Sequence, residues 1–233
     1  MRMLLPTLLV ASCLALPVAG ACLPNHTEVR ITENIVPPRI DFSRNSEQIK
    51  SSKIGDAPMG DYKYAEMTGI TDAMISIDSE IRTTASGPPN GPACIWPSVV
   101  SVKLSTAPII YVDPSHGECR KAVALEHEMG HVAIDRQVIE RYIPIVRYHV
   151  ALLAEAIGSV PAPSYDGLAA ARGRIEDKIN ALLAVIDDSL VADRAAAAAA
   201  HDSPEEYLRV SRACPTITVE PASIAPLRER HAS

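Results

Sequence analysis

Hydrophobic and polar residues change their spacing near the middle of the chain. Up to about residue 112 the two kinds alternate in short runs between turn residues, whereas from about residue 115 the chain is alanine-rich with apolar residues three and four positions apart. Strict alternation is typical of half-buried strands, and the wider spacing places apolar residues on one face of a helix. The pattern therefore predicts an α+β fold, in which a small antiparallel sheet precedes a helical C-terminal half.

Short runs in the first half define the expected strands. Residues 27–33 alternate as a half-buried strand does, and residues 62–67 form a second candidate. Thr71 is a candidate N-cap, because apolar residues recur at helical spacing after it, so a helix is expected there. Two β-rich runs, at 98–104 and 109–112, flank the sequence Ser-Thr-Ala-Pro and predict a hairpin.

The second half predicts four helices. Ser115 and Glu118 fit a capping box, so the first helix is expected to begin there. Pro144 disfavours its continuation, because proline lacks the backbone N–H that an interior helical position donates. Ser203, followed by proline and two glutamates, is a strong start signal for the last helix. The expected ranges are about 115–142, 145–157, 166–200 and a short helix from 203.

The N-terminus has the pattern of an export signal over residues 1–21. Arg2 is followed by an apolar run over 4–18 that is too short, and too interrupted by proline, to span a membrane. Ala19-Gly20-Ala21 then fits the small-x-small rule for signal peptidase. A secreted or periplasmic location is therefore expected, and lipid attachment at Cys13 or Cys22 is the alternative.

Cleavage after this signal would leave one α+β domain. It would cover residues 22–215, with its helical half over about 145–213 and a tail over 216–233. The four cysteines of this part predict two disulfides in an exported chain. We expect one bond to tie the hairpin entrance to the first helix and the other to clamp the termini. The expected pairs are Cys94–Cys119 and Cys22–Cys214.

Composition narrows the classes of partner. Lys and Arg number 22 against 28 Asp and Glu, giving a formal net charge of −6, and only 4% of residues are aromatic. Nucleic-acid binding needs a basic patch and often stacking platforms, so we expect no nucleic-acid partner. Nothing after the export signal is apolar enough to predict a transmembrane span.

The chemistry of the chain is concentrated in the sequence His-Glu-Met-Gly-His at 127–131, inside the first expected helix. On a helix the two histidines lie about 40° apart in projection, and the main apolar stripe lies on the opposite side. One turn apart, both imidazoles can reach a single ion in the tetrahedral geometry that zinc prefers. We therefore predict His127 and His131 as Zn²⁺ ligands, the alternative being a solvated pair of histidines. Gly130 disfavours the helix and would let another backbone approach the metal.

Glu128 lies beside this pair and explains why the chemistry needs more than two histidines. Its direction is offset by about 100° from His127, so it can hold a metal-bound water instead of the metal. Zinc lowers the pKa of such a water towards about 7. Glu128 can then act as the general base and later pass the proton to a leaving amine.

A third protein ligand is needed, and the sequence leaves its identity open. Asp135 is unsuitable because its Cα would be about 12 Å from that of His127, so a hydrogen bond to His131 is expected instead. Gln137 stands where the longer H-E-x-x-H-x-x-G-x-x-H pattern requires its last histidine, which excludes that class. We expect Glu155, presented by an antiparallel second helix, ahead of the other candidates. These are His149, Glu176, Asp187 and His201.

Through the sequence HEMGH the chain resembles the zincin metallopeptidases. The resemblance implies His127 and His131 as zinc ligands and Glu128 as the general base. It also implies an antiparallel edge strand near the cleft that pairs with an extended substrate, and residues 99–112 could supply it.

A looser similarity covers more of the chain. The sequences YKYAEMTGIT at 62–71 and CIWPSVVSVKL at 94–104, followed by the motif helix, are similar to a bacterial family of uncharacterised secreted, predicted zinc-dependent proteases. The glutamate-bearing third-ligand helix of thermolysin-like enzymes is not recognisable in the sequence.

The combined expectation is an exported zinc-dependent hydrolase that cleaves a peptide or protein substrate. Two alternatives remain open at this point. One is a non-catalytic envelope protein that binds a partner through its helical half, with zinc structural or absent. The other is a hydrolase of a non-peptide amide such as a cell-wall link. The sequence does not fix the substrate, the presence of a propeptide or the oligomeric state.

Overall fold

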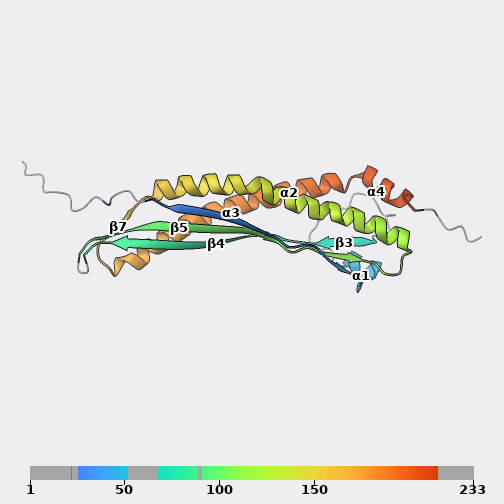
Figure 1. Cartoon of the computed structure of the whole chain (residues 1–233), viewed down its shortest axis with the longest axis horizontal. Coiled ribbons are helices and arrows are strands. Elements are labelled where there is room, and N and C mark those ends of the chain that lie inside the picture. The colour runs from blue at the N-terminus through green and yellow to red at the C-terminus, as the bar shows by residue number, and fades with distance from the viewer. Residues whose placement is uncertain (1–21, 23–25, 52–67, 89–90, 215–233) are drawn as a thin grey trace, which may run out of the picture.

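The computed structural model describes residues 22, 26–51, 68–88 and 91–214 and shows an elongated α+β fold (Figure 1). A long, narrow layer of strands lies along two long helices, α2 (Glu118–Ile157) and α3 (Gly167–His201). The helical C-terminal half is completed by α4 (Pro204–Arg212). The expected fold class is confirmed, whereas the export signal at 1–21, the strand at 62–67 and the tail lie outside the described residues.

The first sheet contains the longest strands. Its order is β1 (Glu28–Ile35), β5 (Ala93–Thr106), β4 (Ile75–Ser86), and β7 (Val160–Ala162) also pairs with β5. β4 and β7 are antiparallel to β5, whereas β1 is parallel to it. The sheet is therefore mixed and not purely antiparallel as expected.

The second sheet continues the first at one end of the molecule. Its order is β2 (Arg39–Asp41), β6 (Ile109–Val112), β3 (Gly69–Asp72), with β2 parallel and β3 antiparallel to β6. Both β1 with β5 and β2 with β6 are parallel, so the chain keeps its direction through the break at 107–108. Across that break Val36 N donates to Thr106 O and Arg39 N donates to Pro108 O. The expected hairpin is therefore wrong, and the proline marks an interruption of one strand path.

The helix expected after Thr71 is also absent from the described residues, because this segment forms β4. Its register with β5 pairs Ile77 with Leu104 and Ile81 with Val100. A spacing of four positions, as between Ile77 and Ile81, keeps side chains on one face of a strand as well as on one face of a helix. The pattern was ambiguous, and pairing with the apolar strand β5 decides it. In the same half, a short helix α1 (Ser46–Ser51) precedes the second sheet's β3.

α2 is one helix of 40 residues, not two as expected, and Pro144 lies inside it. Pro144 and the preceding Glu140 are exposed, so the hydrogen bond that proline cannot make is lost on the solvent side. The opposite face is a continuous row of buried residues, which holds the helix through the proline. The row includes Val138, Ile139, Tyr142, Val146 and Val150. At the start, Gly117 is the N-cap and makes no side-chain cap, so the predicted capping box is wrong.

The last two helices agree with the sequence pattern. α3 covers the long helix expected over about 166–200, with its buried stripe facing the sheet and α2. α4 begins after Ser203, whose Oγ accepts a hydrogen bond from the backbone N–H of Glu206 at 3.2 Å. The start signal read from Ser203 is therefore confirmed.

Two disulfides are present, with pairings other than those expected. Cys22 is bonded to Cys94, and Cys119 to Cys214. The expected Cys94–Cys119 bond required a hairpin, but the strand path from Cys94 extends about 60 Å before α2 begins. Cys119 and Cys94 therefore lie at opposite ends of the molecule, as Figure 1 shows for the start of β5 and of α2. Two disulfides fit an extracellular or periplasmic protein. Within the described ranges, no helix has the length and apolar character that crossing a bilayer requires.

Candidate metal centre

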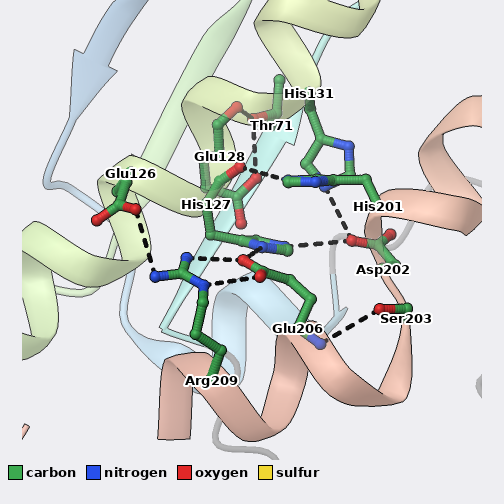
Figure 2. A network of polar contacts seen from close by, with 10 residues as sticks. All are labelled: Thr71, Glu126, His127, Glu128, His131, His201, Asp202, Ser203, Glu206 and Arg209. Carbon is green, nitrogen blue, oxygen red and sulfur yellow. Dashed lines mark hydrogen bonds and ion pairs between the residues drawn. The ribbon is translucent and has the colours of Figure 1, made fainter. Parts of the chain in front are cut away.

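Three histidines from two helices meet at one end of the molecule. His127 and His131 lie one turn apart on α2, and His201 is the last residue of α3. One nitrogen from each ring lies within 4.8 Å of the others, a spacing that could hold a metal ion. Figure 2 shows the three side chains converging from the two helices. His127 is 9% exposed and its two partners are partly buried, so the group is largely enclosed.

His201 takes the place expected for Glu155, and the continuous α2 is the reason. Glu155 is exposed and lies about 36 Å from His131 along the same helix, which places it beyond reach of the ion. His149 fails for the same reason, because it is exposed on that helix about 27 Å away. The two α3 candidates, Glu176 and Asp187, precede His201 by about 38 Å and 21 Å. His201 was one of the alternatives left open by the sequence.

Gly130 explains how His201 reaches the motif. A Cβ built at this position would overlap with Nε2 and Cε1 of His201 and would lie 3.2 Å from its Cδ2. The His201 ring stacks on that of His127 with centroids 4.6 Å apart, and its Nε2 lies 3.0 Å from the backbone oxygen of His127. The glycine therefore admits a side chain, where the sequence had predicted the approach of a backbone.

Asp202, which follows His201, faces the same two imidazoles. Its Oδ1 lies 3.2 Å from Nε2 of His127 and 3.0 Å from Nε2 of His131. Burial opposes ionisation, but contact with the two histidines prevails and holds the pKa of Asp202 well below its usual range. A half-buried carboxylate whose Oδ1 is buried therefore lies where the two motif histidines converge.

The other nitrogen of His127 is held by a carboxylate from α4. Nδ1 lies 3.1 Å from Oε1 of Glu206, and the guanidinium of Arg209 donates one hydrogen bond of 2.7 Å to each carboxylate oxygen of Glu206. The hydrogen bond from Arg209 is the main cause that lowers the pKa of Glu206 to about 2. Burial lowers the pKa of His127, but its contacts with Asp202 and Glu206 outweigh burial and raise it. A carboxylate on one ring nitrogen orients the other towards the ion.

Glu128 points towards β3, beside the three histidines. It is 5% exposed, and its Oε2 accepts a hydrogen bond of 2.8 Å from Oγ1 of Thr71. Gly69, in the same strand, makes room for this side chain, since a Cβ there would lie 3.0 Å from Cγ of Glu128. Burial raises the pKa of Glu128 above its ordinary value. A carboxylate with a raised pKa and one fixed oxygen suits general acid–base work near neutral pH.

Two further expectations about this region are wrong. Asp135 does not contact His131, because it forms an ion pair with Arg194 of α3 at 2.6 Å. It is 1% exposed, so the pair fastens α2 to α3 next to the site. Residues 99–112 do not form an edge strand, since β5 and β6 are the central strands of their sheets. β3 is one of the two edge strands of the second sheet within the described residues, and it carries Thr71 beside Glu128.

The residues that the sequence did not identify come from the α3–α4 junction and from β3. Asp202 and Glu206 belong to a segment whose pattern predicted only a helix start, and nothing local relates them to a motif far earlier in the chain. Thr71 was expected as a helix N-cap but lies in β3, and the sequence placed Gly69 in no element. One sequence signal points to this part of the site: a second histidine followed by an acid, His201-Asp202, stands directly before the helix start at Ser203.

Comparison of the chain with protein-family models, with curated proteins and with solved structures finds no match. The donor set itself therefore carries the chemical argument. Neutral imidazoles suit Zn²⁺, Cu²⁺, Fe²⁺ and Ni²⁺, and three histidines form one of the ligand sets of catalytic zinc. The residues present fit such an ion.

Proposed function

We propose that the chain is an exported hydrolase that uses Zn²⁺ to cleave a peptide bond. The observation that carries the proposal is the combination of three converging histidines with a buried glutamate on the same helix turn. The general resemblance of His-Glu-Met-Gly-His to zincins supports the same assignment. His127, His131 and His201 would hold the ion.

Bound there, the ion would polarise a substrate carbonyl and lower the pKa of a water molecule. The residues of the chain perform the remaining tasks. Glu128 accepts the proton of the attacking water and later delivers it to the leaving amine. Thr71 fixes one oxygen of Glu128, which leaves the other free to receive the proton. β3 offers a strand edge next to this carboxylate, where an extended peptide could add as a further strand.

Replacement of the base tests the proposal. Glu128→Gln should retain the metal and lose about 10²- to 10⁴-fold in kcat for a mixture of quenched fluorescent peptides. Glu140→Gln is the matched control, because Glu140 is an exposed glutamate on the same helix, far from the site. Equal rates for the wild type and for Glu128→Gln, with the ion bound in both, would contradict the proposed mechanism.

Removal of a ligand tests the metal site separately. His127→Ala and His131→Ala should purify with little Zn²⁺ by elemental analysis, whereas His149→Ala should contain as much as the wild type. His149 is a suitable control, since it lies exposed on α2. A wild-type protein that folds fully and binds no divalent ion would instead support the non-catalytic alternative.

One observation favours that alternative. Together with the three histidines, Asp202 makes a set of four protein donors, and structural zinc sites are closed by four protein ligands. Structural sites commonly use cysteine, however, and all four described cysteines are in disulfides. The role of Asp202 therefore separates the two functions.

A further inference from the structure

We propose that Asp202 is a fourth, displaceable donor to the ion held by His127, His131 and His201. This inference rests on the metal site of the proposed function and adds a form of regulation to it. In the resting protein the coordination sphere would be complete, and release of Asp202 would open one position beside Glu128.

The distances around Asp202 fit shared coordination better than an ordinary ion pair. Two ligands of a tetrahedral zinc ion are about 3.3 Å apart when each is about 2.0 Å from the metal. The separations of Oδ1 from Nε2 of His127 and His131 are 3.2 and 3.0 Å, whereas a charge-assisted hydrogen bond is typically about 2.7–2.9 Å. Despite these short separations Oδ1 is buried and has no partner of hydrogen-bond geometry in the described part of the chain. Such an oxygen is costly to bury unless another group, such as a cation, satisfies it.

The position of Asp202 in the fold gives an independent reason. Asp202 is the C-cap of α3, and its backbone N–H donates to Ala198 O at 2.9 Å. The cap therefore uses the backbone, and the helix does not need this side chain. A carboxylate at a helix C-terminus is disfavoured by the helix dipole, which makes a structural role in the cap still less suitable. The contacts of the Asp202 carboxylate are instead with the two motif histidines, His127 and His131.

The consequence is a site that is closed at rest. Catalytic zinc keeps one coordination position for substrate or water, whereas four protein ligands leave none. Asp202 lies in the junction between α3 and α4, and α4 is fastened to the start of α2 by the Cys119–Cys214 disulfide. Rotation of the partly exposed Asp202 side chain would withdraw its carboxylate, while His127, His131 and His201 stay in place.

Azide binding to the cobalt-substituted protein tests this arrangement without any assay of activity. Co²⁺ reports its ligands through visible absorption, and azide changes the spectrum only where a position is open. The wild type should show little change with azide, and Asp202→Ala should show a saturable shift with an apparent affinity at least about tenfold higher. Asp202→Asn keeps the side-chain volume and should behave like Asp202→Ala. Asp188→Ala, at an exposed aspartate of α3, should behave like the wild type.

Two results would overturn the inference. An azide response of equal strength in the wild type and in Asp202→Ala would show that Asp202 is not a ligand. Loss of Co²⁺ from both Asp202 variants, with retention in His201→Ala, would make Asp202 the third ligand and His201 a bystander. Thermal unfolding of each variant shows that it is folded before the comparison is made.

Hydrolysis measured on the same proteins distinguishes this inference from the proposed function. Opening of the site in Asp202→Ala without hydrolysis of any peptide would refute the hydrolase and keep the closed site. Hydrolysis by a wild type that already binds azide would refute the closed site and keep the hydrolase. If both hold, Asp202→Ala should cleave peptides about tenfold or more faster than the wild type, and adding Glu128→Gln should abolish the gain.

Discussion

The two halves of α2 are stabilised by different kinds of contact. The second half presents apolar residues to a large core formed with α3 and the first sheet, including Val138, Ile139 and Val146. The first half faces a much smaller apolar cluster and buries His127, Glu128 and Asp135. The first sheet and its core therefore supply most of the stability, which allows the other end to hold a polar site whose groups would be costly to bury alone.

The largest expected effect is on the apolar half. Ile139 is fully buried, so Ile139→Ala should lower the free energy of unfolding by about 2–5 kcal/mol. Urea titration measures this loss, and metal content of the folded protein should stay unchanged. Val185, which is 64% exposed on α3, provides the control, and Val185→Ala should change stability by less than about 0.5 kcal/mol. A loss of the bound ion in Ile139→Ala would show that the two halves are not separable.

The two disulfides sharpen the comparison, since each serves one end. Cys22–Cys94 joins positions 72 apart and Cys119–Cys214 joins positions 95 apart. Because loop entropy grows slowly with length, replacing either pair by serine should cost a similar amount, about 2–4 kcal/mol, with a difference of only about 0.3 kcal/mol. Only loss of the pair that fastens α4 should weaken metal binding, because α4 carries Glu206.

Equilibrium unfolding and metal titration of the two double-serine proteins measure these effects. The free energy of unfolding should be nearly the same in the two proteins, whereas the metal affinity should be lower in the protein that lacks Cys119–Cys214. Equal metal affinity in both would show that α4 stays in place without its disulfide.

The fold class and the C-terminal helices could be predicted, because long periodic patterns and the Ser203 start signal are local properties. The strand paths could not. A spacing of four residues fits a strand face and a helix face equally, and the break at 107–108 resembles a turn until the parallel partners are known. Pro144 does not end the helix, because residues on both sides of it, such as Tyr142 and Val146, stay buried in the core.

For the site, one turn of helix was enough to predict that His127 and His131 converge, whereas the role of Glu128 as a base stays a prediction. The third histidine depends on how α3 returns along α2, and that crossing is a property of the whole core. Gly130 does mark a close approach to the motif helix, but the sequence pattern does not identify the approaching residue as His201. The expected disulfide pairs and the expected hairpin were wrong for the same reason. Both depend on whether the chain reverses or continues at 107–108, which the local sequence does not determine.

Gly130→Ala should break the site while leaving the core intact. The added methyl overlaps with the ring of His201 and would displace it, so metal affinity should fall by about 10- to 100-fold. Gly173→Ala is the matched control, because Gly173 lies in α3 with open space around its missing Cβ. That substitution should leave metal binding unchanged and raise stability by about 0.5–1 kcal/mol. Competition titration against a zinc chelator measures both affinities, and equal values would exclude His201 from the site.

The smallest expected effect concerns the acid sensitivity of the polar end. Asp113, which directly follows β6, is 2% exposed and accepts hydrogen bonds from Ser46 Oγ at 2.5 Å, Ser46 N at 2.6 Å and Ser115 N at 2.8 Å. The hydrogen bond from the Ser46 side chain is the main cause that holds the pKa of Asp113 well below its ordinary value of 3.8. The folded pKa is thus below the unfolded one, so this stabilisation is complete above about pH 5 and is lost progressively as the pH falls below about 4.

Asp113→Asn should therefore cost about 1–3 kcal/mol at pH 7, because an amide accepts fewer hydrogen bonds than a carboxylate. The difference from the wild type should shrink as the pH is lowered to 3, which urea unfolding at pH 7, 5 and 3 measures. Asp72→Asn, at an exposed position of the adjacent β3, should show neither the cost nor the pH dependence. Since apolar burial carries no such dependence, acid should loosen the end that holds the histidines before it affects the first sheet. A cost of Asp113→Asn that stays constant down to pH 3 would mean that Asp113 acts through packing and not through its charge.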